Sequence, residues 1–231
     1  MSVVYSFAMV IRVMVLHGRS VLYTFLYNAI IIRYQWRFKM KKIILASTSI
    51  SRKQQLQRLN ITFDVIPPLV DEKKLKQKIS DHWKLSRELS RSKVQSISKQ
   101  FNKAIIIGGD TITSFNGSIV SKPKTKENAF KQLKMLNGNE HQVITSAAIS
   151  VKDKVYIHTI IAKMKMRQLS SEQILRYIEY DRPLHSCGSC RLDSMGISLF
   201  DSIDCEDYTS IIGIPLMWTS KILNEHGVAI P

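Results

Sequence analysis

Acidic residues, cysteine and long apolar runs are all scarce in this chain of 231 residues. It carries 18 Asp and Glu against 34 Lys and Arg, and the formal net charge of +16 suits nucleotides, nucleic acid or anionic membrane. Only three cysteines are present, which argues against a disulfide-stapled secreted scaffold and favours a reducing, cytoplasmic setting. No apolar stretch reaches the roughly 18 residues of a membrane-spanning helix, so no stable membrane span is expected.

Several common functional signatures are also absent. The sequence has no G-x-x-x-x-G-K-[ST] phosphate loop, no G-x-G-x-x-G fingerprint, no H-E-x-x-H and no G-x-S-x-G elbow. These absences argue against kinase, dehydrogenase, zincin and hydrolase-elbow functions. The sequence also lacks an RNA-reading aromatic motif and a helix-turn-helix pattern, so no nucleic-acid partner is expected despite the basic charge.

The amino-terminal residues differ in composition from the rest of the chain. The first acidic residue is Asp64, and ten Lys and Arg precede it. Met40, followed by two lysines and an apolar strand pattern, would be a natural chain start. We therefore interpret residues 1–39 as an atypical apolar and basic extension, arising from a mis-set start or acting as a targeting or membrane-surface segment. Residues 40–231 are predicted to form a single domain.

Strand and helix patterns alternate along this domain, which predicts an α/β protein with a mixed sheet. Short apolar runs predict strands at 42–46, 63–66 and 104–107, and longer strands are predicted at 143–151 and 155–166. Helices are predicted at 52–59, 81–101, 125–136 and 170–180, with a last helix opened by Pro215. Gly108 and Gly109 are expected to end the 104–107 strand, and Asn116-Gly117 indicates a hairpin turn.

Polar and charged residues in these elements suggest a phosphate-handling site. They are Ser47, Ser49, Arg52, Lys93, Asp110 and Lys122. If they converge at the strand ends, the cations suit a polyphosphate and the carboxylate can hold a metal ion or deprotonate water. Each also has a structural interpretation. The hydroxyls can cap a helix, Lys93 can extend from an apolar stripe to solvent, and Asp110 can form a simple turn.

A second pattern is the C-x-x-C of Cys187 and Cys190, with His185 upstream and Cys205 downstream. Four such residues could supply a zinc site, and the two cysteines could instead form a redox pair. The structural alternative is a tight loop of small residues.

The candidate phosphate-handling residues resemble the motifs of the Maf family of nucleotide pyrophosphatases. KIILASTSISRK at 42–53 resembles the family's opening ASTSPxRR motif, and Val70-Asp71-Glu72 resembles its VDE. AIIIGGDTI at 104–112 resembles the strand that carries the catalytic Asp, and SIVSKP at 118–123 resembles the GKP hairpin. The resemblance covers residues 42–226. It implies a Maf/ITPase-like fold, a mixed twisted sheet with helices in two lobes around a nucleotide cleft.

The carboxy-terminal part is similar to the 7-methyl-GTP pyrophosphatase branch of this family. The similar segments are 183–189, 196–200 and 212–216. Asp193 stands where that branch has Glu, which keeps a carboxylate for a cationic 7-methylguanine ring. The resemblance implies hydrolysis of 7-methyl-GTP to 7-methyl-GMP and pyrophosphate.

The resemblance also assigns roles to single residues. Asp110 would be the general base that activates water, with a divalent cation (Mg, Mn or Co) held by Glu72 and Asp110. Arg52, Lys93 and Lys122 would bind the phosphates, together with Ser47 and Ser49. The residues that would tune base choice are Ser51, Thr111 and Asp193. Family members are often dimers, so a homodimer is one expectation.

Some residues depart from the family pattern. Ile50 replaces a proline, Ser51 replaces a Trp or Arg, and Lys53 replaces an Arg. Thr111 is closer to the branch that prefers dTTP and UTP. A dTTP/UTP pyrophosphatase is therefore one alternative, and a non-catalytic nucleotide-binding protein linked to cell division is another.

Overall fold

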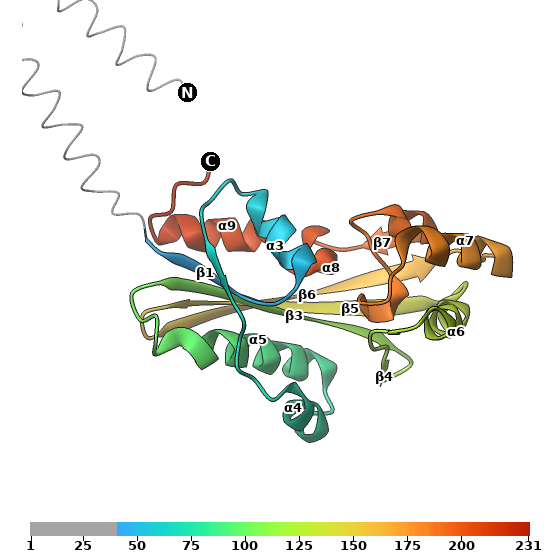
Figure 1. Cartoon of the computed structure of the whole chain (residues 1–231), viewed down its shortest axis with the longest axis horizontal. Coiled ribbons are helices and arrows are strands. Elements are labelled where there is room, and N and C mark those ends of the chain that lie inside the picture. Colours follow the sequence, from blue (N-terminus) through green and yellow to red (C-terminus); the bar gives the residue numbers. More distant parts are fainter. Residues whose placement is uncertain (1–40) are drawn as a thin grey trace, which may run out of the picture. The chain divides into compact units, whose positions relative to one another are not determined.

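The computed structural model describes residues 41–231, which form one compact unit. The expected extension at 1–39 lies outside these described residues. A seven-stranded sheet runs through the unit, with α3, α8 and α9 on one face and α4 and α5 on the other (Figure 1). Within residues 41–231, no helix is long and apolar enough to cross a membrane.

The sheet is mixed, as predicted. Its strands lie in the order β2-β1-β3-β5-β6-β7, and β4 pairs with β3 outside this path. The strand β1 is parallel to β2 and β3, whereas the other pairs are antiparallel. The bounds are β1 Ile43–Ala46, β2 Asp64–Ile66, β3 Ile105–Phe115, β4 Ser118–Ile119, β5 Glu140–Val151, β6 Lys154–Met166 and β7 Phe200–Asp204.

Most helices begin at side-chain caps that the sequence supplies locally. Ser49, Asp71, Asp81, Thr125 and Ser170 each accept a hydrogen bond from a backbone N–H of the first turn. The helices are α3 Ile50–Gln57, α4 Glu72–Lys78, α5 His82–Ser98, α6 Lys126–Leu136, α7 Ser171–Asp181, α8 Thr209–Ile212 and α9 Leu216–Glu225. Two 3₁₀ turns, η2 Cys187–Ser189 and η3 Met195–Leu199, follow α7. The elements α4, α8 and β7 were not predicted.

The prediction that the two glycines end the strand is wrong. The strand β3 continues through them to Phe115, because Gly108 pairs with Ala148 and the register with β5 stays regular as far as Ser114. The ladder of backbone hydrogen bonds holds the glycines in extended conformation. Asp110 therefore lies in the middle of a strand and not at a strand end.

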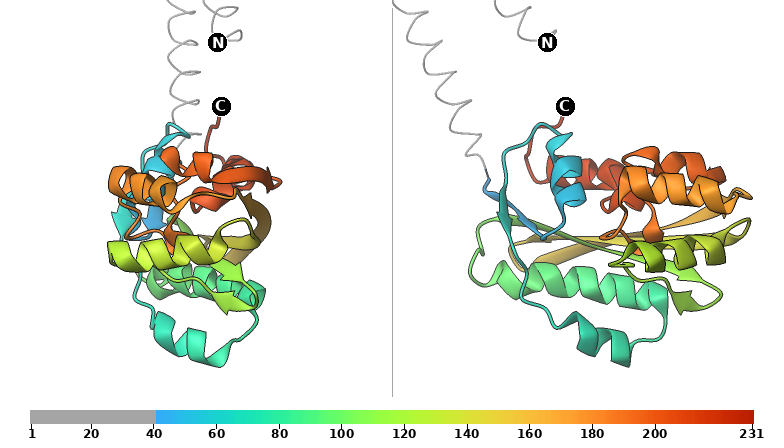
Figure 2. Two further views of the ribbon diagram at one scale, coloured as in Figure 1. Left: turned by 90° about the vertical axis from the view of Figure 1, so that its right-hand side faces the viewer. Right: turned by 45° about the vertical axis from the view of Figure 1, so that its right-hand side comes forward.

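Two groups of buried residues divide the unit into two lobes. In the first lobe, Leu45 and Ile107 pack toward α3 and α9, while Ile106 packs with Val94 of α5. In the second lobe, α6 and α7 share a separate core with residues such as Leu133 and Ile174. Figure 2 shows α6 and α7 at one end of the long strands β5 and β6, and β1 lies toward the other end. The predicted two-lobed α/β fold is confirmed.

Candidate active site

The candidate site surrounds the middle of β3, where successive side chains point to opposite faces of the sheet. Gly108 and Asp110 face α5, and Lys93 of that helix contacts Asp110. Gly109 and Thr111 face α3 on the other side. The sheet therefore divides the predicted site residues between two faces.

One edge of β3 is open at this point, and groups from both faces reach it. In the described part of the chain, β1 pairs with only the first three residues of β3, and β4 pairs with only the last two. Between these partners, Lys93 Nζ lies 3.5 Å from the carbonyl oxygen of Gly109, and Cys187 Sγ lies 3.8 Å from that of Thr111. These two carbonyls point to the same edge because their residues are two apart. Lys93 and Cys187, which are far apart in the chain, therefore both lie at this open edge.

Below the sheet, one lysine joins two carboxylates. Lys93 Nζ lies 2.7 Å from Asp110 Oδ1 and 2.9 Å from Glu72 Oε1. The side chains of Lys93 and Asp110 are only 8% and 10% exposed. Burial alone would raise the pKa of Glu72, but Lys93 and then Lys76 lower it below its ordinary value. Glu72, the more exposed of the two carboxylates, is therefore ionised at neutral pH.

Above the sheet, Arg52 is fixed against two glycines. Its Nε donates to the carbonyl of Gly213 at 3.1 Å, and its Nη2 donates to Thr111 Oγ1 at 3.2 Å. A Cβ on Gly213 would lie 3.0 Å from the Arg52 side chain, and a Cβ on Gly109 would lie 2.9 Å from the Gly213 carbonyl. Gln55, on the same helix as Arg52, exchanges hydrogen bonds with the backbone of Ile214 at 2.9 and 3.0 Å. The close approach therefore requires glycine at both positions.

The serines that precede α3 organise the backbone. Ser47 Oγ accepts from the N–H of Ser49 at 3.1 Å, and Ser49 Oγ accepts from the N–H of Arg52 at 3.3 Å. Ser51 is half-buried in the first turn of α3. The Ser49 hydroxyl caps α3, and the Ser47 hydroxyl orders the turn between β1 and that cap.

Cys187 lies among the charged residues of both faces. Burial raises the pKa of its thiol, and the charged groups that act on it are Lys122, Asp110, Arg52 and Lys76. The three cations lower that pKa and the carboxylate raises it. The charge of the exposed Lys122 thus acts on the same thiol as the charges of Arg52 and Asp110, although these residues are far apart in the chain.

Sequence comparison places the whole described domain in one family. The model of the family described as "Maf-like protein" matches residues 42–226. The chain belongs to the Maf family. The family predicted from the sequence is confirmed, and with it the class of nucleotide pyrophosphatases, hydrolases that act on phosphoric anhydride bonds.

Curated relatives of this Maf chain differ in the substrate that their names give. The 7-methyl-GTP pyrophosphatase of Bdellovibrio bacteriovorus is 39% identical, over 79% of this chain and 96% of that protein. The corresponding protein of Pseudomonas aeruginosa is 34% identical, over 83% and 100%. The dTTP/UTP pyrophosphatase of Aquifex aeolicus is also 34% identical, over 80% and 95%. Identity alone therefore does not separate the two substrates.

A solved structure also matches this Maf chain in part. The HAM1 protein of Coxiella burnetii covers 55% of the chain and 73% of its own length, with a TM-score of 0.37 and 14% identity. This likeness is too weak to support an argument about fold or function.

The predicted specificity residues of this Maf chain are only partly brought together. Thr111 contacts Arg52, and Ser51 lies on the same helix as Arg52. Asp193 lies between η2 and η3, where its carboxylate accepts from Arg191 at 3.4 Å. Within residues 41–231, its hydrogen bonds do not join it to the cluster around Asp110.

The zinc interpretation of the C-x-x-C is wrong. No group of three or more His, Cys, Asp and Glu among residues 41–231 could hold a metal ion. Cys187 points to the Thr111 carbonyl, Cys190 points to the Gly196 carbonyl, and both thiols are free. The two sulfurs have different partners, which favours the loop interpretation.

Sequence reasoning missed three residues that shape the site. Lys76 lies one helical turn after Glu72. The Asp71 cap marks the helix start, and the i,i+4 spacing of Glu72 and Lys76 within that helix could have indicated their ion pair. The Gly213 carbonyl accepts from Arg52, and Gln55 donates to the neighbouring Ile214 carbonyl; each contact spans more than 150 residues of chain. No local pattern indicates such a contact.

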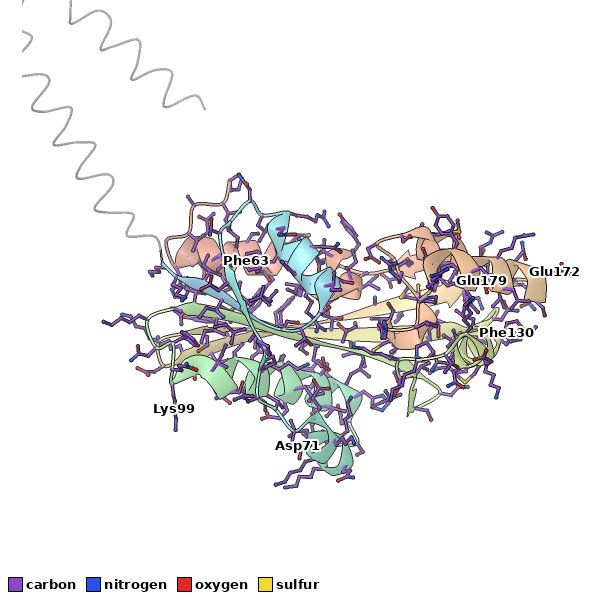
Figure 3. The ribbon with its side chains drawn as sticks, viewed as in Figure 1. Phe63, Asp71, Lys99, Phe130, Glu172 and Glu179 are labelled. Atoms are coloured by element: carbon purple, nitrogen blue, oxygen red, sulfur yellow. The ribbon has the colours of Figure 1, made fainter. Side chains whose placement is uncertain are left out.

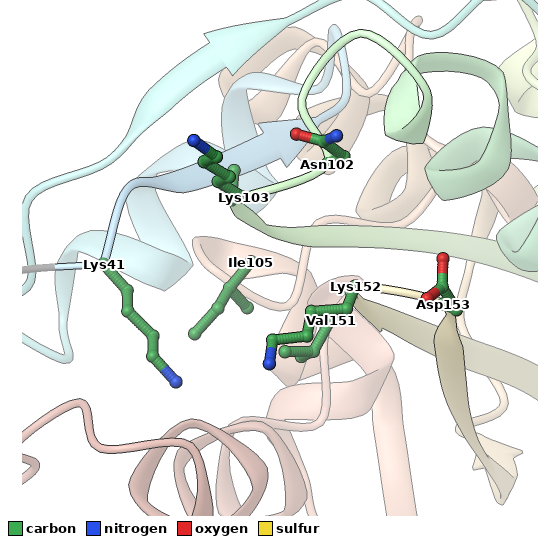
Figure 4. Close-up of a pocket in the computed structure, with 8 residues that line it drawn as sticks. Lys41, Asn102, Lys103, Ile105, Val151, Lys152 and Asp153 are labelled. Atoms are coloured by element: carbon green, nitrogen blue, oxygen red, sulfur yellow. The ribbon is translucent and has the colours of Figure 1, made fainter.

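A shallow pocket lies elsewhere, at the start of β1 and β3 (Figure 4). Its lining includes Lys41, Lys103 and Lys152, together with Asp153 of the β5–β6 turn. Its lining residue on β3, Ile105, comes five residues before Asp110, and none of its lining residues belongs to the site described above.

Proposed function

We propose that this protein hydrolyses 7-methyl-GTP to 7-methyl-GMP and pyrophosphate by attack of water on the α phosphorus. The observation that carries the proposal is the buried contact of Lys93 with Asp110 at the open edge of β3. Arg52 contacts Thr111, the next residue of β3, on the other face of the sheet. Two of the relatives described above are named 7-methyl-GTP pyrophosphatase, which supports this substrate.

Asp110 is the proposed general base. Lys93 engages Oδ1 of this carboxylate, so Oδ2 is the oxygen to which a water molecule can donate. Because Lys93 holds this buried carboxylate in place, its orientation toward the water is already set before the proton is transferred. The Lys93 ammonium stays close to the developing charge on the phosphate, where a fixed cation is most effective.

Arg52 and Lys122 are proposed to bind the phosphates together with Lys93. Arg52 offers a planar fork that matches phosphate oxygens, and its orientation is set by the Gly213 carbonyl and the Thr111 hydroxyl. Lys122 is exposed, and it follows β4 on the second-lobe side. Ser47 and Ser49 contribute by fixing the turn that carries Arg52.

The residues present fit a divalent cation. Glu72 and Asp110 are two carboxylates that already converge on one cationic group, and magnesium is commonly held by one or two carboxylates plus substrate phosphates. When bound, such an ion would neutralise phosphate charge and polarise the P–O bonds. Glu72 and Asp110 would hold it, and Lys93 would keep the rest of the site cationic.

Base choice is proposed to depend on Asp193, Ser51 and Thr111. A carboxylate suits 7-methylguanine, because the ring is cationic and its Watson–Crick edge donates hydrogen bonds. Asp193 is paired with Arg191 in an exposed contact, which is weak enough to be exchanged for a ligand.

A dTTP/UTP pyrophosphatase is the second candidate. Thr111 supports it, because a threonine at this position resembles the branch that prefers dTTP and UTP. Its hydroxyl contacts Arg52 Nη2 and Thr145 Oγ1, both at 3.2 Å. The Aquifex aeolicus relative carries that name.

The deciding experiment is pyrophosphate release by the full chain from 7-methyl-GTP, GTP, dTTP, UTP and CTP, with Mg²⁺ or Mn²⁺. Asp110→Asn is compared with Asp153→Asn, which makes the same change in the exposed β5–β6 turn. We expect 7-methyl-GTP to be turned over fastest, Asp110→Asn to lose at least about a hundredfold in kcat, and Asp153→Asn to match the unchanged protein.

Other outcomes separate the alternatives. A preference for dTTP or UTP, with Asp110→Asn inactive, would support the second candidate and refute the role given to Asp193. Binding of nucleotides without any hydrolysis would refute the catalytic proposal and favour a nucleotide-binding protein.

A further inference from the structure

The helix α4 is held in a defined orientation beside the site. It begins after its cap, Asp71, on the face of the sheet that carries α5 (Figure 3). Leu75 and Ile79 pack against the buried cluster of Leu85 and Leu89. Because residues four apart share one helix face, this packing also fixes the neighbouring row that contains Glu72 and Lys76.

Charges alternate outward from Asp110 along this row. Lys93 lies 2.7 Å from Asp110 and 2.9 Å from Glu72, and Lys76 Nζ lies 3.6 Å from the other oxygen of Glu72. The inner two side chains are buried, at 10% exposed for Asp110 and 8% for Lys93, whereas the outer two are 41% exposed for Glu72 and 46% for Lys76. Lys76 is therefore the outermost cation of a connected cluster, at the point where the cluster opens to solvent.

Lys76 also acts on the interior of the site. The thiol of Cys187 lies at the open edge of β3, and Lys76 is one of the charged groups that influence it, along with Lys122, Asp110 and Arg52. Those other groups come from both faces of the sheet. The charge of Lys76 therefore acts on the same thiol as the charges of Arg52 and Lys122, two of the cations that were predicted from the sequence.

We propose that Lys76 is a further substrate-binding residue, which contacts the β and γ phosphates that leave as pyrophosphate. The inference rests on the proposed function, because it assumes that water attacks the α phosphorus near Asp110. Lys76 is three contacts outward from that carboxylate, so it faces the phosphates farthest from the point of attack. Its ion pair with Glu72 is long and half-exposed, and exchanging it for a phosphate costs little.

The charge balance of the site supports this role. Without Lys76, three cations (Arg52, Lys93 and Lys122) stand against the two carboxylates of Glu72 and Asp110. With Lys76, four cations stand against two carboxylates. A nucleoside triphosphate carries several negative charges close together, and the added excess of positive charge stabilises it in the site.

The test measures binding of inorganic pyrophosphate and of 7-methyl-GMP to the full chain by calorimetry. The variant is Lys76→Gln, and Lys76→Arg keeps the charge. The matched control is Lys74→Gln, which removes the same charge from α4 two residues from Glu72, on the opposite side of the helix. Thermal unfolding of each variant checks that α4 stays folded.

We expect Lys76→Gln to weaken pyrophosphate binding about fivefold, with the difference shrinking as salt rises. Binding of 7-methyl-GMP should be unchanged, because it lacks the two outer phosphates. The KM for the triphosphate should rise by the same factor while kcat stays constant. Lys74→Gln and Lys76→Arg should match the unchanged protein. Equal pyrophosphate binding by Lys76→Gln and Lys74→Gln would overturn the inference.

Failure of this inference and failure of the proposed function give different results. If no triphosphate is hydrolysed but Lys76→Gln still weakens pyrophosphate binding, Lys76 is a phosphate ligand and the catalytic proposal fails. If hydrolysis occurs and both lysine variants bind pyrophosphate alike, the function holds and the role of Lys76 is refuted. If the unchanged protein does not bind pyrophosphate, the inference is also refuted.

Discussion

The ammonium of Lys93 lies 2.7 Å from a carboxylate oxygen of Asp110, and both side chains are almost completely buried. Such a pair contributes little net stability while it is intact, because both ions lost water on burial. Removal of one partner leaves the other charge buried and unpaired. Loss of either residue alone is therefore destabilising, apart from its effect on any chemistry at Asp110.

We predict that Lys93→Met lowers the free energy of unfolding by about 3–5 kcal/mol, because Asp110 is then buried without a partner. Adding Asp110→Asn should restore about 1–3 kcal/mol of that loss. Urea unfolding at pH 7 measures both. The exposed pair of Lys42 and Asp64, at 2.9 Å, is the control, and Lys42→Met should cost less than about 1 kcal/mol. Equal losses for Lys93→Met and Lys42→Met would contradict the prediction.

A second prediction concerns Gly213, which has φ +142° and lies against Arg52. Gly213→Ala should displace the guanidinium, because the new Cβ would be 3.0 Å from the Arg52 side chain. We expect KM for the nucleotide to rise and stability to fall by about 1–3 kcal/mol.

Gly227→Ala is the control for Gly213→Ala. Gly227 also has a positive φ, +80°, but nothing lies within 4 Å of the added Cβ. It should lower stability through backbone strain alone and leave KM unchanged. If both variants raise KM equally, the contact with Arg52 is not what requires Gly213.

The third prediction concerns pH and stability. Burial lowers the pKa of His141 to about 4, and its Nδ1 has no hydrogen-bond partner among the described residues. The unfolded chain, with an ordinary pKa near 6.5, takes up a proton first, so stability is lost as pH falls from about 6.5 toward 4. The loss from this residue should reach about 3 kcal/mol at pH 4.

Urea unfolding between pH 7 and pH 4 tests this pH dependence. His141→Leu should flatten the acid side of the stability curve, whereas His185→Gln, at an exposed position, should leave its slope unchanged. An unchanged acid slope in His141→Leu would show that other groups control acid unfolding.

Local signals in the sequence were sufficient to predict much of the fold and the main candidate site residues. The Asn116-Gly117 turn forms as expected, with positive φ at both residues. The cap at Ser170 also forms, with Gln173 completing it. Apolar periodicity located α5, and with it the unusual buried Lys93. Each of these features depends on residues within a few positions of one another, so a local sequence pattern is enough to predict it.

Contacts between distant segments decided how far β3 extends and which site residues lie together. Pairing with β5 kept β3 extended through Gly108 and Gly109, against the local tendency of glycine to end a strand. That pairing put Asp110 and Thr111 on opposite faces, so Lys93 contacts one face of β3 and Arg52 contacts the other. The sequence by itself determined which residues carry the charge and where most helices begin. Only the tertiary structure decided which of them meet, because strand pairing and burial join segments that local patterns cannot relate.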